Sequence, residues 1–176
     1  MAVSEYGKAL FLLTEELHTT EGARGDVLLA GEIFRSNPTY VKLLDTPAIP
    51  KEEKLNLIDE AFSGIDENLR NLIKILCEHH SVFTFPEVER TFLALYNEAR
   101  GIIEVEAISA VPLSDEQIGR ISEKLKKSTG KTIVLKNTVS PEILGGLKLR
   151  YQGVQLDGSI KTRLDKFEAS LKNTVI

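Results

Sequence analysis

The sequence predicts an all-α N-terminal six-helix bundle over residues 1–104, followed by a small α+β C-terminal domain over residues 105–176. Through the first hundred residues, apolar side chains recur at steps of three and four, the period of an amphipathic helix. After Gly101, short stretches of alternating apolar and polar residues indicate strands. The charge changes sign at the same point. Residues 1–104 carry 10 Lys or Arg against 18 Asp or Glu, a net of −8, whereas residues 105–176 carry 12 against 8, a net of +4.

Turn residues divide the helical half into six segments. The first helix has an apolar stripe from Val3 to Leu17 and is predicted to end at Glu21 and Gly22. Pro50 suits the first turn of the fourth helix, because a missing N–H costs nothing there. Asp66 can cap the fifth helix with its side chain. The predicted second to sixth helices span residues 26–34, 38–44, 51–62, 66–79 and 86–100.

The second half combines two further helices with short strands. Ser114 and Gln117 have the spacing of a capping box, and Gly130 supplies the stop of the helix that this box opens. Residues 147–151 and 154–156 are predicted to form a hairpin, and a last helix covers residues 160–171. The other predicted strands span residues 103–109 and 132–135. We interpret five residues first as turn and capping residues: Gly145, Gly146, Asp157, Gly158 and Ser159.

Catalysis has no support in the sequence. Gly130-Lys131-Thr132 resembles the end of a phosphate-binding loop, but the position five residues before Gly130 holds Leu125 inside a predicted helix. His79 and His80 point about 100° apart on a helix, and no second His or Cys cluster completes a metal site. We therefore predict no catalytic residue, no cofactor and no metal.

Composition narrows the other classes of function. Cys77 is the single cysteine, so no internal disulfide can form, and a reducing compartment is expected. The apolar runs fall short of the ~20 residues that cross a bilayer, and no secretory signal is evident. Nucleic-acid binding is disfavoured, because the pI is about 5.5 and few aromatic residues accompany the lysines near Gly130. The charge asymmetry fits two halves that face different partners, or two solvated surfaces.

Several segments, in their order and spacing, carry a resemblance over nearly the whole chain. Tyr6-Gly7-Lys8-Ala9-Leu10-Phe11 opens the first helix, and the most specific stretch is residues 143–150, followed by residues 156–160. With these segments the sequence resembles the delta subunit of bacterial F-type ATP synthases, which is related to the mitochondrial oligomycin sensitivity-conferring protein. Two departures stand out. Gly7 replaces the usual alanine, and Tyr151-Gln152-Gly153 replaces a pattern nearer Val-Gly-Asp.

The resemblance implies a non-catalytic stator subunit that couples rotary torque to ATP synthesis and to proton or other ion transport. The helical domain would bind the N-terminal segments of the alpha subunits on the catalytic head, and the C-terminal domain would bind the far end of the b-subunit stalk. The chain would be a monomer in isolation and one copy per complex. It would lie peripherally at the cytoplasmic face of the plasma membrane, without direct membrane insertion.

For the head side we predict a groove between the first and fifth helices that receives an amphipathic alpha-subunit helix. Its residues would be Tyr6, Gly7, Leu10, Leu13, Leu69, Ile73 and Leu76, although each of these could instead belong to the core of the bundle. For the stalk side the expected contacts are the basic residues Arg150, Lys161 and Arg163. The alternative functions are a two-domain adaptor outside any ATP synthase and a small enzyme.

Overall fold

A computed structural model describes residues 3–143, 146–151 and 154–157 of the chain. The chain divides into two compact units, Met1–Ala99 and Arg100–Ile176, and each is described by itself. It is mostly helical, with a small mixed sheet in the second unit, as the sequence predicts at that level. The predicted division after residue 104 falls inside the first strand of this sheet.

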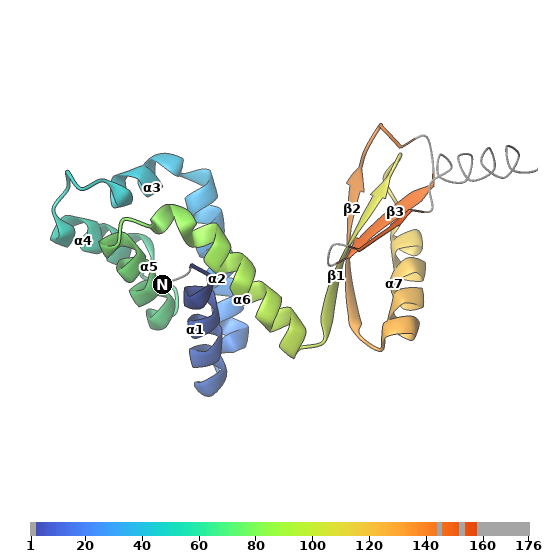
Figure 1. Ribbon diagram of the computed structural model, residues 1–176, viewed down its shortest axis with the longest axis horizontal. Helices are drawn as coiled ribbons and strands as arrows, with labels where there is room; N and C mark the ends of the chain where they lie inside the picture. Colours follow the sequence, from blue (N-terminus) through green and yellow to red (C-terminus); the bar gives the residue numbers. More distant parts are fainter. Residues whose placement is uncertain (1–2, 144–145, 152–153, 158–176) are drawn as a thin grey trace, which may run out of the picture. The chain divides into compact units, whose positions relative to one another are not determined.

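The first unit consists of helices joined by short turns (Figure 1). Their stripes of apolar residues face one another, and the aromatic rings of Phe34, Phe62 and Phe85 meet in the core, with centroids 5.3 and 5.0 Å from that of Phe34. The elements are α1 (Val3–Glu16), α2 (Thr20–Ser36), α3 (Pro38–Asp45), α4 (Lys51–Ala61), α5 (Glu67–Glu78), the 3₁₀ turn η1 (Val82–Thr84) and α6 (Phe85–Ala99).

The predicted end of the first helix is wrong. α1 ends at Glu16, and α2 already begins at Thr20, so Glu21 and Gly22 lie in the first turn of α2. His18 adopts a left-handed backbone conformation with φ 57°, and the N–H of Thr19 donates to the carbonyl of Thr14 at 2.9 Å. This is a Schellman stop in which histidine takes the place usually held by glycine.

α5 ends by the same device. His80 has φ 51°, its N–H donates to the carbonyl of Cys77 at 3.1 Å, and the N–H of Ser81 donates to that of Leu76 at 2.9 Å. At the other end of α5, the Asp66 carboxylate accepts hydrogen bonds from the N–H groups of Asn68 and Leu69, which confirms the predicted cap.

The second unit holds a four-stranded sheet of order β2-β1-β3-β4. β1 pairs in parallel with β2 and antiparallel with β3, and β3 and β4 form the predicted antiparallel hairpin. α7 connects the two parallel strands and packs beside β2 (Figure 1). The elements are β1 (Ile102–Ser109), α7 (Asp115–Thr129), β2 (Thr132–Val139), β3 (Leu147–Tyr151) and β4 (Val154–Asp157).

Local signals place α7 correctly, whereas β2 is longer than predicted. The capping box of Ser114 and Gln117 is present, and Gly130 ends the helix in a left-handed conformation with φ 69°. β2 continues four residues beyond the predicted end at Leu135, through a polar stretch that carries Asn137. The Asn137 side chain donates to the carbonyl of Ala107 and to Ser109 Oγ, both at 2.8 Å, and accepts from the N–H of Leu113 at 2.8 Å. These bonds explain a polar residue inside the strand.

Candidate partner-binding surfaces

The inner face of α1 is occupied by α6 of the same unit. A Cβ at Gly7 would come within 2.6 Å of the Val88 carbonyl oxygen and 2.8 Å of Thr91 Cβ, so the two helices lie close together there. The Phe11 and Phe92 rings continue this contact edge to face, with centroids 5.9 Å apart. Gly7 and Leu10 are therefore buried within the unit rather than offered to an outside partner, which corrects their assignment to a groove.

The predicted groove residues of α5 are likewise in the core. Leu69, Ile73 and Leu76 have no exposed surface, so the alternative left open by the sequence describes them correctly. Their spacing of three and four residues satisfies a core stripe as well as a binding stripe, which is why the pattern could not separate the two.

A second apolar stripe of α1 remains accessible. Leu13 and Leu17 are 39% and 50% exposed, and Tyr6 is half-buried. Tyr6 and Leu13 lie seven positions apart on one line of α1, and Leu17 follows four positions later, directly after the helix end, where its N–H donates to the Leu13 carbonyl at 3.0 Å. Tyr6 is rotated by about 100° from Gly7 and hence from the α6 contact. Besides α6, α1 contacts α2 and α5.

On α5, Ile75 was missed by the sequence reasoning. It is 43% exposed, although it lies among the core residues of the helix. Lys74 and Arg70 bind Asp59 of α4, at 2.7 and 3.4 Å, so that side of α5 faces α4. Ile75 lies on the opposite flank. The sequence did carry a signal for it. Ile75 precedes Leu76 and makes the apolar stripe of the helix wider than one core face needs.

We name Tyr6, Leu13, Leu17 and Ile75 the α1–α5 surface. All four are apolar or amphipathic and at least partly accessible; the first three lie on α1 and directly after it, Ile75 lies on α5, and α1 and α5 contact each other. Leu12 is more exposed, at 55%, but it is rotated by about 100° from Leu13 around the helix axis and does not belong to this surface.

The predicted basic contacts of the second unit are only partly described. Arg150 on β3 is exposed and pairs with Glu106 on β1, with 3.2 Å between Nη1 and Oε2. Lys161 and Arg163 lie outside the described residues, as do Gly145, Gly158 and Ser159. Gly146 has φ 86° immediately before β3, consistent with the predicted turn role, and Asp157 is the last residue of β4.

The residues examined for chemistry have structural roles where they are described. The N–H of Gly130 donates to the Lys126 carbonyl at 2.8 Å, as in a helix stop. Cys77 Sγ donates to the Leu44 carbonyl at 3.4 Å, and burial raises the pKa of its thiol. Within residues 3–143 and the short described segments after them, no three His, Cys, Asp or Glu side chains gather as metal ligands. None of the described helices combines the length and apolar character needed to cross a membrane.

Comparison with known proteins extends the resemblance over the chain. Residues 2–171 match the family described as the ATP synthase delta (OSCP) subunit. ATP synthase subunit delta of Geobacillus sp. (strain WCH70) is 34% identical over 167 residues, which cover 94% of each chain. The subunit of Clostridioides difficile (strain 630) is 30% identical over 174 residues, which cover 98% of this chain and 96% of that relative.

A solved structure supports the fold independently. A chain in the cryo-EM structure of the Toxoplasma gondii mitochondrial ATP synthase hexamer aligns with a TM-score of 0.73 and 23% identity, over 97% of both chains. The match to the family and to its bacterial relatives spans both units, so it does not depend on one shared domain. The chain belongs to the ATP synthase delta (OSCP) subunit family, and it is a non-catalytic stator component of the peripheral stalk of an F-type ATP synthase.

Proposed function

We propose that the first unit, a six-helix bundle, binds the N-terminal segments of the alpha subunits and that the second unit binds the C-terminal end of the b-subunit stalk. The observation that carries the head-side assignment is the α1–α5 surface. Its apolar residues are accessible, whereas the inner face of α1 already packs against α6 and cannot bind a second helix. Such a surface suits one face of an amphipathic helix, anchored at positions three, four and seven apart.

The size of this surface is compatible with a tight joint. Nanomolar affinity requires about −12 kcal/mol, and a few central anchors usually supply most of such a total. Fully burying a leucine or isoleucine side chain contributes about 1.5–3 kcal/mol. Leu13, Leu17 and Ile75 each have between 39% and 50% of their surface left to bury, so contacts beyond these residues must add to the total. Tyr6 adds a ring with a polar tip at one end.

A matched pair of variants tests this surface. Leu13→Asp places a charge on the proposed contact, whereas Leu12→Asp makes the same change at the neighbouring, more exposed residue outside the α1–α5 surface. We expect Leu13→Asp and Ile75→Asp each to weaken binding of a synthetic alpha N-terminal peptide to the full chain at least tenfold, and Leu12→Asp to leave it unchanged. Calorimetry gives the affinities, and circular dichroism verifies folding. Equal affinity of the Leu13→Asp and Leu12→Asp chains would refute the assignment.

For the stalk side, the support is the charge of the second half. Residues 105–176 carry a net charge of +4, and the exposed Arg150 pairs with the half-buried Glu106 of β1 at 3.2 Å. Lys161 and Arg163, which lie outside the described residues, are proposed as stalk contacts on the sequence alone. Charges at an interface rim set the orientation and the association rate, so we expect association with a purified b-subunit fragment to slow as salt increases. An association rate that does not change between 50 and 500 mM salt would contradict a charged contact.

The two contacts together would make the chain a joint that keeps the head from turning with the rotor, so that torque drives ATP synthesis and ion transport. We propose one copy per complex, a monomer in isolation, and a peripheral place at the cytoplasmic face of the plasma membrane. Fractionation tests this placement. The chain should sediment with membrane-bound ATPase and be released with the head by low-salt stripping. An adaptor that acts outside the synthase would stay in the supernatant.

A further inference from the structure

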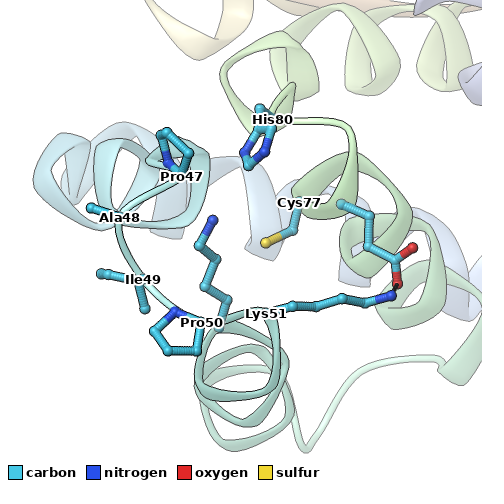
Figure 2. A pocket seen from close by; sticks show the side chains of 9 residues that line it. Pro47, Ala48, Ile49, Pro50, Lys51, Cys77 and His80 are labelled. Atoms are coloured by element: carbon cyan, nitrogen blue, oxygen red, sulfur yellow. Dashed lines mark ion pairs between the residues drawn. The ribbon is translucent and has the colours of Figure 1, made fainter.

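A pocket of about 570 Å³ opens between the loop that joins α3 to α4 and the C-terminal end of α5. In Figure 2 the loop residues Pro47, Ile49 and Pro50 face Cys77 and His80 across this space. None of these residues belongs to the α1–α5 surface. The lining residues are Pro47, Ala48, Ile49, Pro50, Lys51, Lys54, Cys77, Glu78 and His80.

The pocket is lined by a lysine whose side chain is largely buried. Lys54 is only 3% exposed, yet in the part of the chain that the structure describes its ammonium has neither an ion pair nor a hydrogen bond. The other lysine of the pocket is different. Lys51 Nζ lies 2.9 Å from Glu78 Oε1, in an exposed ion pair that neutralises both groups. An ammonium that lines a pocket and has no carboxylate partner among the described residues attracts an anion, because a charge-assisted hydrogen bond can form there.

The carboxylate of Asp45, at the end of α3, is engaged elsewhere. Asp45, close enough to influence the Cys77 thiol, accepts hydrogen bonds from the N–H groups of Val82 and Phe83 at 2.8 and 3.0 Å. These two bonds hold η1 against the end of α3. Asp45 is thus fixed as a structural acceptor.

The first turn of α4 reinforces the attraction for an anion. α4 begins at Lys51, and its N-cap Pro50 contributes no side-chain hydrogen bond to the free N–H groups of that turn. The positive end of the helix dipole therefore lies at the pocket wall, where negative charge is favoured. Glu52 and Glu53 of the same turn are exposed and do not line the pocket.

We propose that this pocket binds a carboxylate carried on a small apolar body, with the carboxylate at Lys54 Nζ and the apolar part against Pro47, Ile49 and Pro50. One unpaired cation matches one negative charge. A dianionic phosphate would need more donors than this one ammonium supplies. The loop supplies apolar surface with little conformational freedom to lose, since two of its five residues, 46–50, are prolines.

The probe is 4-phenylbutyrate, titrated into the ¹⁵N-labelled full chain and followed by NMR. For a single charged contact and a body of this size, we expect a Kd on the order of 1 mM. The amide signals that shift should include those of Ile49, Lys51 and Cys77. The neutral isostere 4-phenylbutyramide should bind at least tenfold more weakly, and inorganic phosphate should bind more weakly than the acid. Equal affinity for the acid and the amide, or shifts that spare this pocket, would overturn the proposal.

Two variants isolate the lysine. Lys54→Met keeps the length and apolar stem of the side chain and should weaken phenylbutyrate binding at least tenfold, because a charge-assisted hydrogen bond is lost. Lys8→Met makes the same charge change at an exposed position of α1 and should leave binding unchanged. Undiminished binding to Lys54→Met would sink the idea. Should that variant fail to fold, the comparison of acid and amide on the unaltered chain decides alone.

Discussion

Replacing Gly7 with alanine should destabilise the first unit, although helix propensity alone predicts the opposite. Alanine is favoured over glycine inside a helix by about 0.8–1 kcal/mol. At Gly7, however, the added Cβ would come within 2.6 Å of the Val88 carbonyl oxygen and 2.8 Å of Thr91 Cβ. The first of these atoms belongs to the α6 backbone, so α1 and α6 must separate to make room.

The two effects can be weighed against each other. Forcing an extra carbon into a well-packed contact costs about 1–3 kcal/mol. After the gain in helix propensity, a net loss of roughly 1 kcal/mol remains. In a unit of this size, a change of 1 kcal/mol shifts the melting temperature by about 4–8 °C. We therefore expect Gly7→Ala to lower the melting temperature by several degrees.

Gly25→Ala is the matched control. Gly25 lies inside α2, is exposed, and an added Cβ there would meet nothing within 4 Å. The same substitution should then stabilise the unit by the full ~0.8–1 kcal/mol. Thermal unfolding followed by circular dichroism at 222 nm compares the two variants with the unaltered chain. If Gly7→Ala stabilises the protein as much as Gly25→Ala does, the close approach of α1 and α6 is wrong.

Three further predictions concern single residues. The Tyr40 hydroxyl donates to the Leu57 carbonyl at 3.1 Å, and burial is the main cause that raises its pKa to about 12. Because the folded state disfavours the phenolate, the stability that the protonated Tyr40 contributes is complete below pH 10 and is lost as the pH rises toward 12. Between pH 10 and 12, the free energy of unfolding measured in urea should therefore fall more steeply for the unaltered chain than for Tyr40→Phe. Ser114→Ala should cost about 1 kcal/mol and speed amide exchange in the first turn of α7. His18→Gly should raise the unfolding free energy by roughly 0.5–1 kcal/mol because φ is 57°, whereas His79→Gly, at φ −90°, should lower it.

Where a local rule has a single physical meaning, the sequence predicted the structure. The spacing of Ser114 and Gln117 gave the start of α7, Asp66 gave the cap of α5, and Gly130 gave a left-handed helix end. The end of α1 was predicted wrongly because its signal is ambiguous. A left-handed residue that ends a helix is usually glycine, but here it is His18, so the sequence predicted that the helix continues to Glu21 and Gly22.

The candidate surface was harder to predict, since burial is a property of the packed unit. Leu10, Leu13, Ile73 and Ile75 are equally apolar, and only packing decides that the first and third are buried while the others remain accessible. Lys54 shows the same limit. Nothing in its sequence context distinguishes a lysine that is 3% exposed beside a pocket from an ordinary surface lysine of an amphipathic helix.

The position of Gly7 links the interior of the unit to its proposed function. Because glycine lets α6 fill the inner face of α1, that face cannot also receive a helix from outside. An alpha-subunit helix, as proposed above, would then be restricted to Tyr6, Leu13 and Leu17 and to Ile75 on α5. Substitutions on different faces of α1 should therefore affect either stability or binding, but not both. Changes at Gly7 should act on the melting temperature, and changes at Leu13 should act on affinity while the unit remains folded.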